Sequence, residues 1–385
     1  MRLIKLSSVS SVVGLVLASG LMGCALESQG EGGESVGSAS QAWLKAPGTA
    51  GFVFSDKLTG SFSAQPARSY NSSAGVNVIS NIATGVYRVD FPGIGSPGGN
   101  VQVTAHGADN MRCKVSDWVN SGTTLQVTVR CFDGSGNPAN SLFTAQYLRR
   151  TDTPGSEAAY VWSFNSTSPG YNPDSGRAWS STGQAMSISN TGDGIYNVNL
   201  PGQDMSGGTV EVTAFGTNNV YCKVIGWFSS TAQVRCFNGG SGAPQNSQFV
   251  LLFSSKVPHN TPASTYVWAH DPSSASYAPV SPWTLGLISH EGNNNPHSAI
   301  ASPVNITRSG TGRYRVFLPL MASMHNNPSS VKVTGYGFDG DTCKVRSWAI
   351  SGADANVDVA CFSSLGAPVD ALYTLTYSSF ATTSF

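Results

Sequence analysis

The residues best suited to covalent chemistry are six cysteines, which occur in pairs within a segment that is present three times along the chain. Each copy contains the pattern Cys-Lys-Val-x-x-Trp and ends with Cys-Phe. The first cysteines are Cys113, Cys222 and Cys343, and the second are Cys131, Cys236 and Cys361. Outside the cytoplasm, the simplest arrangement is one disulfide within each copy. Zinc binding is the alternative, but zinc sites use close Cys/His pairs, whereas these cysteines stand singly on separate expected strands.

The lysine and the tryptophan of this pattern also recur in every copy. The lysines are Lys114, Lys223 and Lys344, and the tryptophans are Trp118, Trp227 and Trp348. Because each lysine alternates with an inward-facing cysteine and valine, we expect it on a solvated outer face. The tryptophans are expected to fill the core beside the disulfides rather than to bind a ligand.

The third copy carries two enlarged polar segments that contain histidines. From an early aromatic residue to a later tyrosine, the first two copies span 25 residues and the third spans 37. The insertion contains His290, Glu291 and His297, and a second enlargement, within 321–330, contains His325. If the strands run up and down, both loops emerge at one pole, where these side chains could converge on a ligand or a substrate. The alternative, a solvated polar loop, is favoured because the spacing is not that of metal ligands.

Three aromatic residues at comparable positions form a second candidate ligand surface. Tyr70, Trp179 and Trp283 each follow an earlier aromatic residue by six to eight positions in a polar, turn-rich context. Such rings can stack on sugar faces while Asn and Ser supply hydrogen bonds. Packing in the core is the alternative, and it is the more common fate of such residues.

Composition excludes other classes of function. The 21 basic and 21 acidic residues balance, and the chain has no basic cluster to neutralise phosphates, so nucleic-acid binding is not expected. The sequence contains no Gly-x-Ser-x-Gly elbow, His-Glu-x-x-His, phosphate-binding loop or dinucleotide fingerprint. We therefore expect a protein without a catalytic site, cofactor or metal.

The elements that position these residues are predicted to be strands. Apolar residues recur with a period of two, and runs of Gly, Asn, Ser and Pro separate them. Polar, proline-containing stretches divide the chain into repeats at 48–150, 157–255 and 263–385, each large enough for its own core. About eight short strands in a unit of this size predict an all-β chain of three tandem antiparallel β-sandwiches of jelly-roll type, with one disulfide in each. A propeller with two blades per repeat is the alternative.

The N-terminus has the features of an export signal. A short basic start and an apolar stretch end at Leu-Met-Gly-Cys24, which resembles the lipobox of bacterial lipoproteins. The resemblance implies that 1–23 is removed and that Cys24 is acylated, while 24–47 forms a flexible tether. An ordinary cleaved signal with an unrelated cysteine is the alternative. The residue after Cys24 is not the aspartate that retains enteric lipoproteins in the inner membrane, so we expect the outer membrane or the cell surface.

The repeat resembles a tandem unit of uncharacterised exported proteins of soil bacteria, which share the Tyr-Val-Trp start, the Gly-x-Tyr-x-Val strand and the cysteine pattern. A weaker similarity to trimeric C1q-like jelly rolls suggests that three copies could mimic such a trimer within one chain. The leading hypothesis is a non-enzymatic, lipid-anchored surface protein that binds a polysaccharide or another envelope component. The alternatives are a structural or spacer protein, or a protein-interaction surface, and, lastly, a hydrolase with its site in the third repeat.

Overall fold

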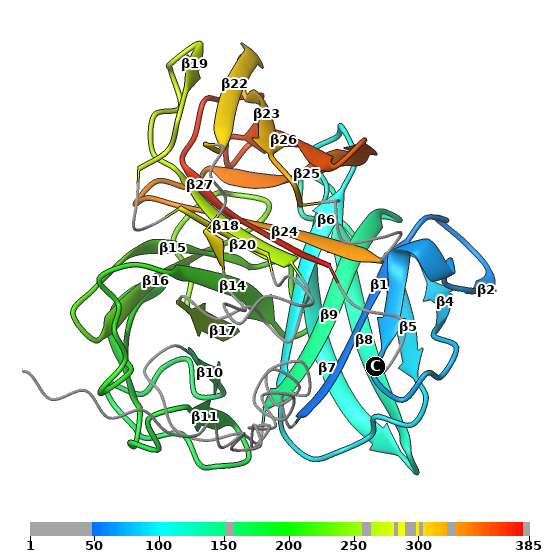
Figure 1. Cartoon of the computed structure of the whole chain (residues 1–385). Helices are drawn as coiled ribbons and strands as arrows, with labels where there is room; N and C mark the ends of the chain where they lie inside the picture. Colours follow the sequence, from blue (N-terminus) through cyan, green and yellow to red (C-terminus); the bar gives the residue numbers. More distant parts are fainter. Residues whose placement is uncertain are drawn as a thin grey trace, which may run out of the picture.

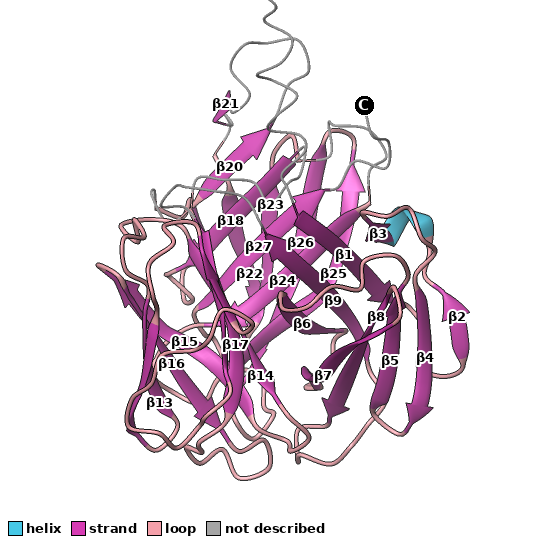
Figure 2. Ribbon diagram, turned by 90° about the horizontal axis from the view of Figure 1, so that it is seen from below, coloured by secondary structure: helices cyan, strands magenta, loops and turns pink. Residues whose placement is uncertain are grey.

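Strands make up nearly all the regular structure of the chain. The computed structural model describes residues 48–150, 158–255, 263–280, 284–288, 298–299, 303–321 and 328–379. Within these ranges the helical structure is a single short 3-10 turn, η1 (Pro66–Arg68), at the edge of the first unit (Figure 2). The expected all-β fold class is confirmed.

The strands fall into three successive units with equivalent members. The first unit contains β1 (Gly48–Ser55), β2 (Ser61–Ser63), β3 (Ser69–Asn71), β4 (Val78–Ala83), β5 (Val86–Phe91), β6 (Asn100–His106), β7 (Arg112–Ser121), β8 (Thr124–Phe132) and β9 (Leu142–Arg150). The second contains β10 (Ala158–Ser163), β11 (Ala178–Ser180), β12 (Ser187–Gly192), β13 (Ile195–Asn199), β14 (Thr209–Phe215), β15 (Tyr221–Phe228), β16 (Thr231–Phe237) and β17 (Gln248–Ser254). The third contains β18 (Ala263–Ala269), β19 (Ser276–Tyr277), β20 (Leu285–Ile288), β21 (Ser298–Ala299), β22 (Asn305–Gly310), β23 (Arg313–Leu318), β24 (Ser329–Gly335), β25 (Thr342–Ser351), β26 (Asp354–Phe362) and β27 (Tyr373–Ser379).

Each unit is a sandwich of two antiparallel sheets. In the first unit the strand order is β6-β9-β1-β3 in one sheet and β7-β8-β5-β4-β2 in the other. The second and third units repeat these orders, with β14-β17-β10-β11 and β24-β27-β18-β20 as the sheets equivalent to β6-β9-β1-β3. Apolar side chains from both sheets of a unit meet in one cluster, so each unit has its own core. The arrangement is that of β-sandwiches and not of propeller blades.

A glycine and a tyrosine that recur in all three copies fix the same turn and strand. The glycine before β5, Gly85, has a φ of 67°, and an added Cβ would lie 2.5 Å from the Cys131 carbonyl oxygen. Its counterparts before β13 and β23 are equally restricted. Two residues later, the buried Tyr87 accepts a hydrogen bond from the Ser141 N–H at 3.1 Å. The pattern Gly-x-Tyr is therefore explained by local structure.

The disulfides join neighbouring strands of one hairpin in each unit, as predicted. They link Cys113 to Cys131, Cys222 to Cys236 and Cys343 to Cys361, with Cα–Cα distances of 4.0, 4.0 and 4.1 Å. In each case the two cysteines are direct cross-strand partners in the ladder.

The three units are packed around a common axis instead of following one another as separate beads. Figure 1 shows the blue-cyan, green and yellow-to-red segments grouped around β6, β14 and β24. Parallel bridges join β14 to β7 at Phe215 and Val115, and β6 to β25 at His106 and Val345. An equivalent bridge links Tyr336 of the third unit to Val224 of the second. Each unit therefore contacts both others, and the three units form a closed cycle.

Candidate functional site at the axis between the three units

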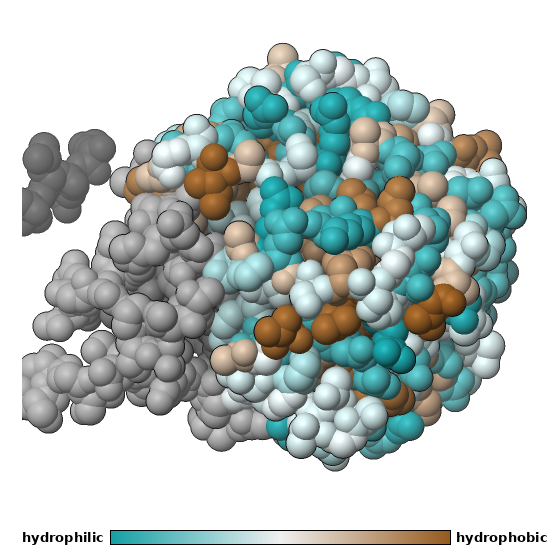
Figure 3. Space-filling view, turned by 90° about the vertical axis from the view of Figure 1, so that its right-hand side faces the viewer, coloured by the Kyte–Doolittle hydropathy of each residue, from teal (hydrophilic) through white to brown (hydrophobic). Residues whose placement is uncertain are grey.

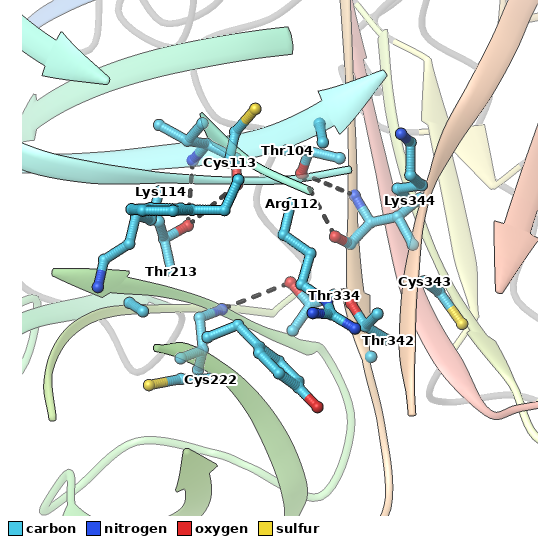
Figure 4. A pocket seen from close by; sticks show the side chains of 18 of the residues that line it. Thr104, Arg112, Cys113, Lys114, Thr213, Cys222, Thr334, Thr342, Cys343 and Lys344 are labelled. Carbon is cyan, nitrogen blue, oxygen red and sulfur yellow. Dashed lines mark hydrogen bonds between the residues drawn. The ribbon is translucent and has the colours of Figure 1, made fainter. Parts of the chain in front are cut away.

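Three threonines at equivalent positions link β6, β14 and β24, the strands nearest the axis, which we call the axial strands. Each threonine hydroxyl accepts a hydrogen bond from a backbone N–H of the neighbouring unit (Figure 4). The pairs are Thr213 with Val103 at 3.0 Å, Thr104 with Val333 at 3.3 Å, and Thr334 with Val212 at 3.5 Å. Because the second unit bonds the first, the third bonds the second and the first bonds the third, the contacts close a ring. This cyclic pattern defines an approximate threefold axis.

The recurring lysines cross from each unit to the next, so the expectation that they lie on a solvated face is wrong. Lys114, Lys223 and Lys344 are only 3, 1 and 4 % exposed. Their ammonium groups contact Asn218 at 2.8 Å, Asp339 at 2.6 Å and Asp109 at 2.5 Å, respectively. The alternation of side chains along a strand correctly places these lysines on the face of the sheet opposite the sandwich core. That face is covered by the neighbouring unit and not by water.

The three lysine contacts differ in charge. Two lysines meet a carboxylate, but Lys114 meets the neutral amide of Asn218. Burial, together with a smaller contribution from the nearby Arg130, lowers the pKa of Lys114 to about 7. Burial also lowers the pKa of Lys223 and Lys344, but Asp339 and Asp109 oppose that shift. The contact between the first and second units therefore buries a lysine whose hydrogen-bond partner, within the described part of the chain, is a neutral amide.

Arg112 closes one end of the axis. Its side chain is 7 % exposed and donates hydrogen bonds to the Gly239 carbonyl at 2.9 Å and the Ser364 carbonyl at 2.9 Å. The guanidinium also lies over the ring of Tyr221, 4.5 Å from its centroid. Gly239 and Ser364 belong to equivalent loops of the second and third units, so a single arginine of the first unit holds both of its neighbours. Burial lowers the pKa of Arg112.

A cavity of about 60 Å³ lies on the axis between the threonine ring and Arg112. Its lining includes the three ring threonines and also Arg112, Lys114 and Lys344 (Figure 4). All three units contribute to its wall, and none of its lining residues is acidic.

Further along the axial strands, three equivalent positions carry an amide, a carboxylate and an ammonium group. Gln102, Glu211 and Lys332 are all buried. The Lys332 Nζ lies 2.7 Å from Glu211 Oε2, in an ion pair without hydrogen-bond geometry. The Gln102 Oε1 accepts a hydrogen bond from the Thr213 hydroxyl at 2.7 Å. A buried pair of this kind is costly to break because either partner alone would be an uncompensated charge.

The recurring tryptophans are packed, as predicted, but each also contacts the neighbouring unit. Trp348 of the third unit packs against Phe54 and His106 of the first, with ring centroids 5.0 and 5.4 Å apart. The other two contact regions are built alike: Trp118 meets Trp162 and Phe215, and Trp227 meets Tyr336. The tryptophan of the repeated pattern thus belongs to a contact between units as well as to its own core.

The structure brings two of the predicted sugar-stacking residues to one apolar cluster between the first and second units. Tyr70 and Trp179, both half-buried, pack against a cluster that includes Leu148 and Tyr160. The Trp179 ring stacks on Tyr160 at a centroid distance of 5.5 Å, and the Arg150 guanidinium lies 5.4 Å from its centroid. Much of the Trp179 ring is thereby engaged by the protein itself.

The remaining predicted site residues lie outside the described residues. They are Cys24, Trp283, His290, Glu291, His297 and His325. Within the described ranges, no cluster of three or more His, Cys, Asp or Glu side chains is suited to a metal ion. The described part of the chain also contains no helix of the length and apolarity needed to cross a membrane.

The residues that sequence reasoning missed are the axial ones. Thr104, Thr213 and Thr334 follow the same Val-x-Val run in each copy, which was a detectable signal. Arg112 has no such signal, because its equivalents are Tyr221 and Thr342. Comparisons with models of protein families, with curated proteins and with solved structures found no match to this chain.

Proposed function

We propose that this chain is a non-enzymatic, lipid-anchored protein of the cell surface that binds an extracellular polysaccharide or another envelope component. The lipobox-like N-terminus supports the anchor. The three disulfides suit an oxidising compartment outside the cytoplasm. The packing of three units around one axis supports a rigid head and speaks against a spacer, since a spacer gains length by keeping its units end to end.

One observation carries the ligand assignment: Tyr70 and Trp179, from different repeats, lie against the same apolar cluster and remain partly exposed. An exposed part of an aromatic surface at the contact between two units suits the apolar face of a sugar. On the face of the first unit shown in Figure 3, apolar residues occur in small separate groups among hydrophilic ones, which suits a protein exposed to water.

The test is a binding measurement with the oxidised, exported Cys24→Ser chain on a panel of glycans and envelope polysaccharides. We expect saturable binding that falls at least tenfold in Trp179→Ala and in Tyr70→Ala. Phe228→Ala is the control, because it removes an aromatic ring that is 56 % exposed on the same unit as Trp179 but outside the cluster. Binding that is insensitive to both cluster variants would place the site elsewhere, and no binding across the panel would favour a structural or protein-binding role.

The anchor has its own test. The wild-type chain is expected to incorporate a labelled fatty acid and to fractionate with the outer membrane, whereas Cys24→Ser should do neither. A Cys24→Ser chain that still carries label would contradict lipidation at this cysteine.

A further inference from the structure

The axial cavity is large enough to hold several waters or a small ion. A cavity needs only about 10–15 Å³ to hold one water, and this one has about 60 Å³. All three units line the cavity, so the charges and hydrogen-bonding groups of their lining residues determine which ligand can bind there.

Three cationic residues contribute to the wall of the cavity. Arg112, Lys114 and Lys344 line the cavity, and no acidic residue does. Asp109, the carboxylate that pairs with Lys344, lies outside the lining and is largely exposed. Lys344 is neutralised by Asp109, whereas the partner of Lys114 is an uncharged amide, so the positive charge around the cavity is only partly compensated. Incomplete compensation of this kind favours an anion.

Unused hydrogen-bond donors also reach this wall. The Nε of Arg112 is buried and has no hydrogen-bond partner among the described residues. The backbone supplies further donors, because the short Cα–Cα distance of 4.0 Å between Cys113 and Cys131 is that of a non-hydrogen-bonded pair. Consistent with this, the Cys131 N–H bonds Gly85 and not β7.

The N–H of Cys113 therefore points away from its hairpin partner, on the edge of β7 where the Val115 carbonyl accepts a hydrogen bond from the second unit. Cys222 and Cys343 occupy the same position in their own ladders. All three cysteines line the cavity. Three backbone donors related by the approximate threefold axis thus accompany the cationic side chains.

We propose that this cavity is a binding site for a small inorganic anion of the size of chloride or nitrate, held on the axis by Arg112 and the backbone N–H groups of the three first cysteines. The anion supplies a counter-charge to Lys114, whose partner Asn218 is neutral, and an acceptor to the buried Nε of Arg112. It would bind only when all three units are assembled, since each contributes to the wall, and would therefore stabilise the assembled head.

The test measures thermal unfolding of the mature chain in detergent at constant pH and ionic strength, with bromide replacing gluconate, which is too large for the cavity. The unfolding midpoint should rise with bromide and level off, as expected for a saturable site. Arg112→Gln should lose this dependence. Arg88→Gln, which removes an exposed arginine of the same unit, is the matched control and should keep it.

Crystals of the wild-type chain grown in bromide provide a measurement that does not depend on a variant folding. An anomalous bromide peak in the axial cavity, within hydrogen-bond distance of Arg112 Nε or of a first-cysteine N–H, is the expected result. A cavity that holds only water, together with an unfolding midpoint that is the same in bromide and gluconate, would overturn the proposal. So would an Arg112→Gln chain that keeps the full bromide dependence.

Discussion

At the position after the first cysteine, a lysine recurs in all three units, but its contacts are of two kinds. Lys223 and Lys344 each meet an aspartate of the next unit, but Lys114 meets Asn218. The lowered pKa of Lys114, about 7, means that between pH 7 and the ordinary lysine value of 10.5 the unfolded chain holds a proton that the folded chain has lost. Stability should therefore rise with pH across this window, while below about pH 7 the cost of the buried charge is fully present.

Asn218→Asp gives Lys114 the counter-charge that the other two lysines have. We expect the free energy of unfolding at pH 7 to rise by about 1 kcal/mol, because the new pair is partly exposed. The increase in stability between pH 7 and pH 10 should also become smaller, since the pKa of Lys114 moves back toward its ordinary value. Denaturant unfolding across this pH range measures both effects, with Asn120→Asp at an exposed position as the control. An unchanged pH profile would contradict the assignment to Lys114.

His106 occupies the position that Phe215 and Tyr336 occupy in the other units. Burial, with smaller contributions from Lys344 and Arg68, lowers its pKa to about 4. As the pH falls from 6.5 to 4, the unfolded chain takes up a proton before the folded one, so stability is lost through this window. The loss should be on the order of 3 kcal/mol.

His106→Phe should remove this acid-induced loss and add apolar packing against Trp348. Unfolding measured at several values between pH 4 and pH 7 tests the prediction. His106→Gln separates the two contributions, because it removes the titration without adding an aromatic ring. If His106→Phe loses stability in acid as the wild type does, other groups are responsible.

For single residues, the sequence predicted the disulfides and the inward-facing side chains correctly, but not which outward-facing side chains are buried. The cysteine pairing followed from spacing and compartment, and the inward tyrosines followed from period two. The burial of Lys114 and its counterparts was not predictable, because alternation tells which side of a strand a residue occupies but not whether a second unit covers that side. The role of Arg112 depends on loops more than a hundred residues away in the sequence.

At the scale of elements, the hairpin of β15 and β16 combines a disulfide with a strand pair that faces the axis. Its cysteines are 14 residues apart. A loop of this length predicts a stabilisation of about 3 kcal/mol through the unfolded chain. The double substitution Cys222→Ala and Cys236→Ala should therefore lower the free energy of unfolding by about that amount.

Denaturant unfolding of the oxidised chain measures this loss. The same change at Cys113 and Cys131, which are 18 residues apart, should cost a similar amount. A much smaller loss at either site would mean that the neighbouring units already restrain the hairpin when the bond is absent.

Strands were the best predicted elements, because the apolar period and the turn glycines are local properties of the sequence. The sheet β6-β9-β1-β3 was predicted only in part. Its strands were expected to be half-buried, yet β6 carries Asn100, Gln102 and Thr104 on a face that is also buried. Asn100 and Thr104 donate hydrogen bonds to the Leu251 and Val333 carbonyls of the neighbouring units, so the usual inference from polarity to exposure fails.

At the scale of the whole molecule, the three units should unfold together. Each unit contacts both others through a hydrogen-bonded threonine, a buried lysine and an aromatic cluster, so loss of one unit exposes surfaces of the other two. Scanning calorimetry should therefore show one cooperative transition. Two or three separable transitions would mean that the units are energetically independent.

Trp348→Ala tests this coupling from a single position. It leaves a cavity between the first and third units and should cost about 3 kcal/mol. We expect the entire transition to move to lower temperature. Ile350→Ala is the control, because this residue lies on the same strand with 51 % of its surface exposed. A shift limited to one part of a divided transition would contradict the prediction.

Three repeats, their sandwich fold and their disulfides were all predictable from periodicity. Their arrangement around an axis was suggested only by analogy. The contacts between units are made by residues such as Thr104 and Phe54, and threonine and phenylalanine are equally common in strands that make no contact with another unit. Packing between repeats is decided by which surfaces complement each other in space, and a one-dimensional pattern does not record it.

In a trimer of identical chains, any residue on the axis meets two copies of itself, so a charged group there faces its own charge twice. Linking three copies in one chain removes that restriction, because each copy can mutate alone. Gln102, Glu211 and Lys332 show the result: one position, three side chains and a balanced pair. Replacing one repeat by either of the other two would bring the wrong side chain to this position. The three repeats are therefore not interchangeable at this position.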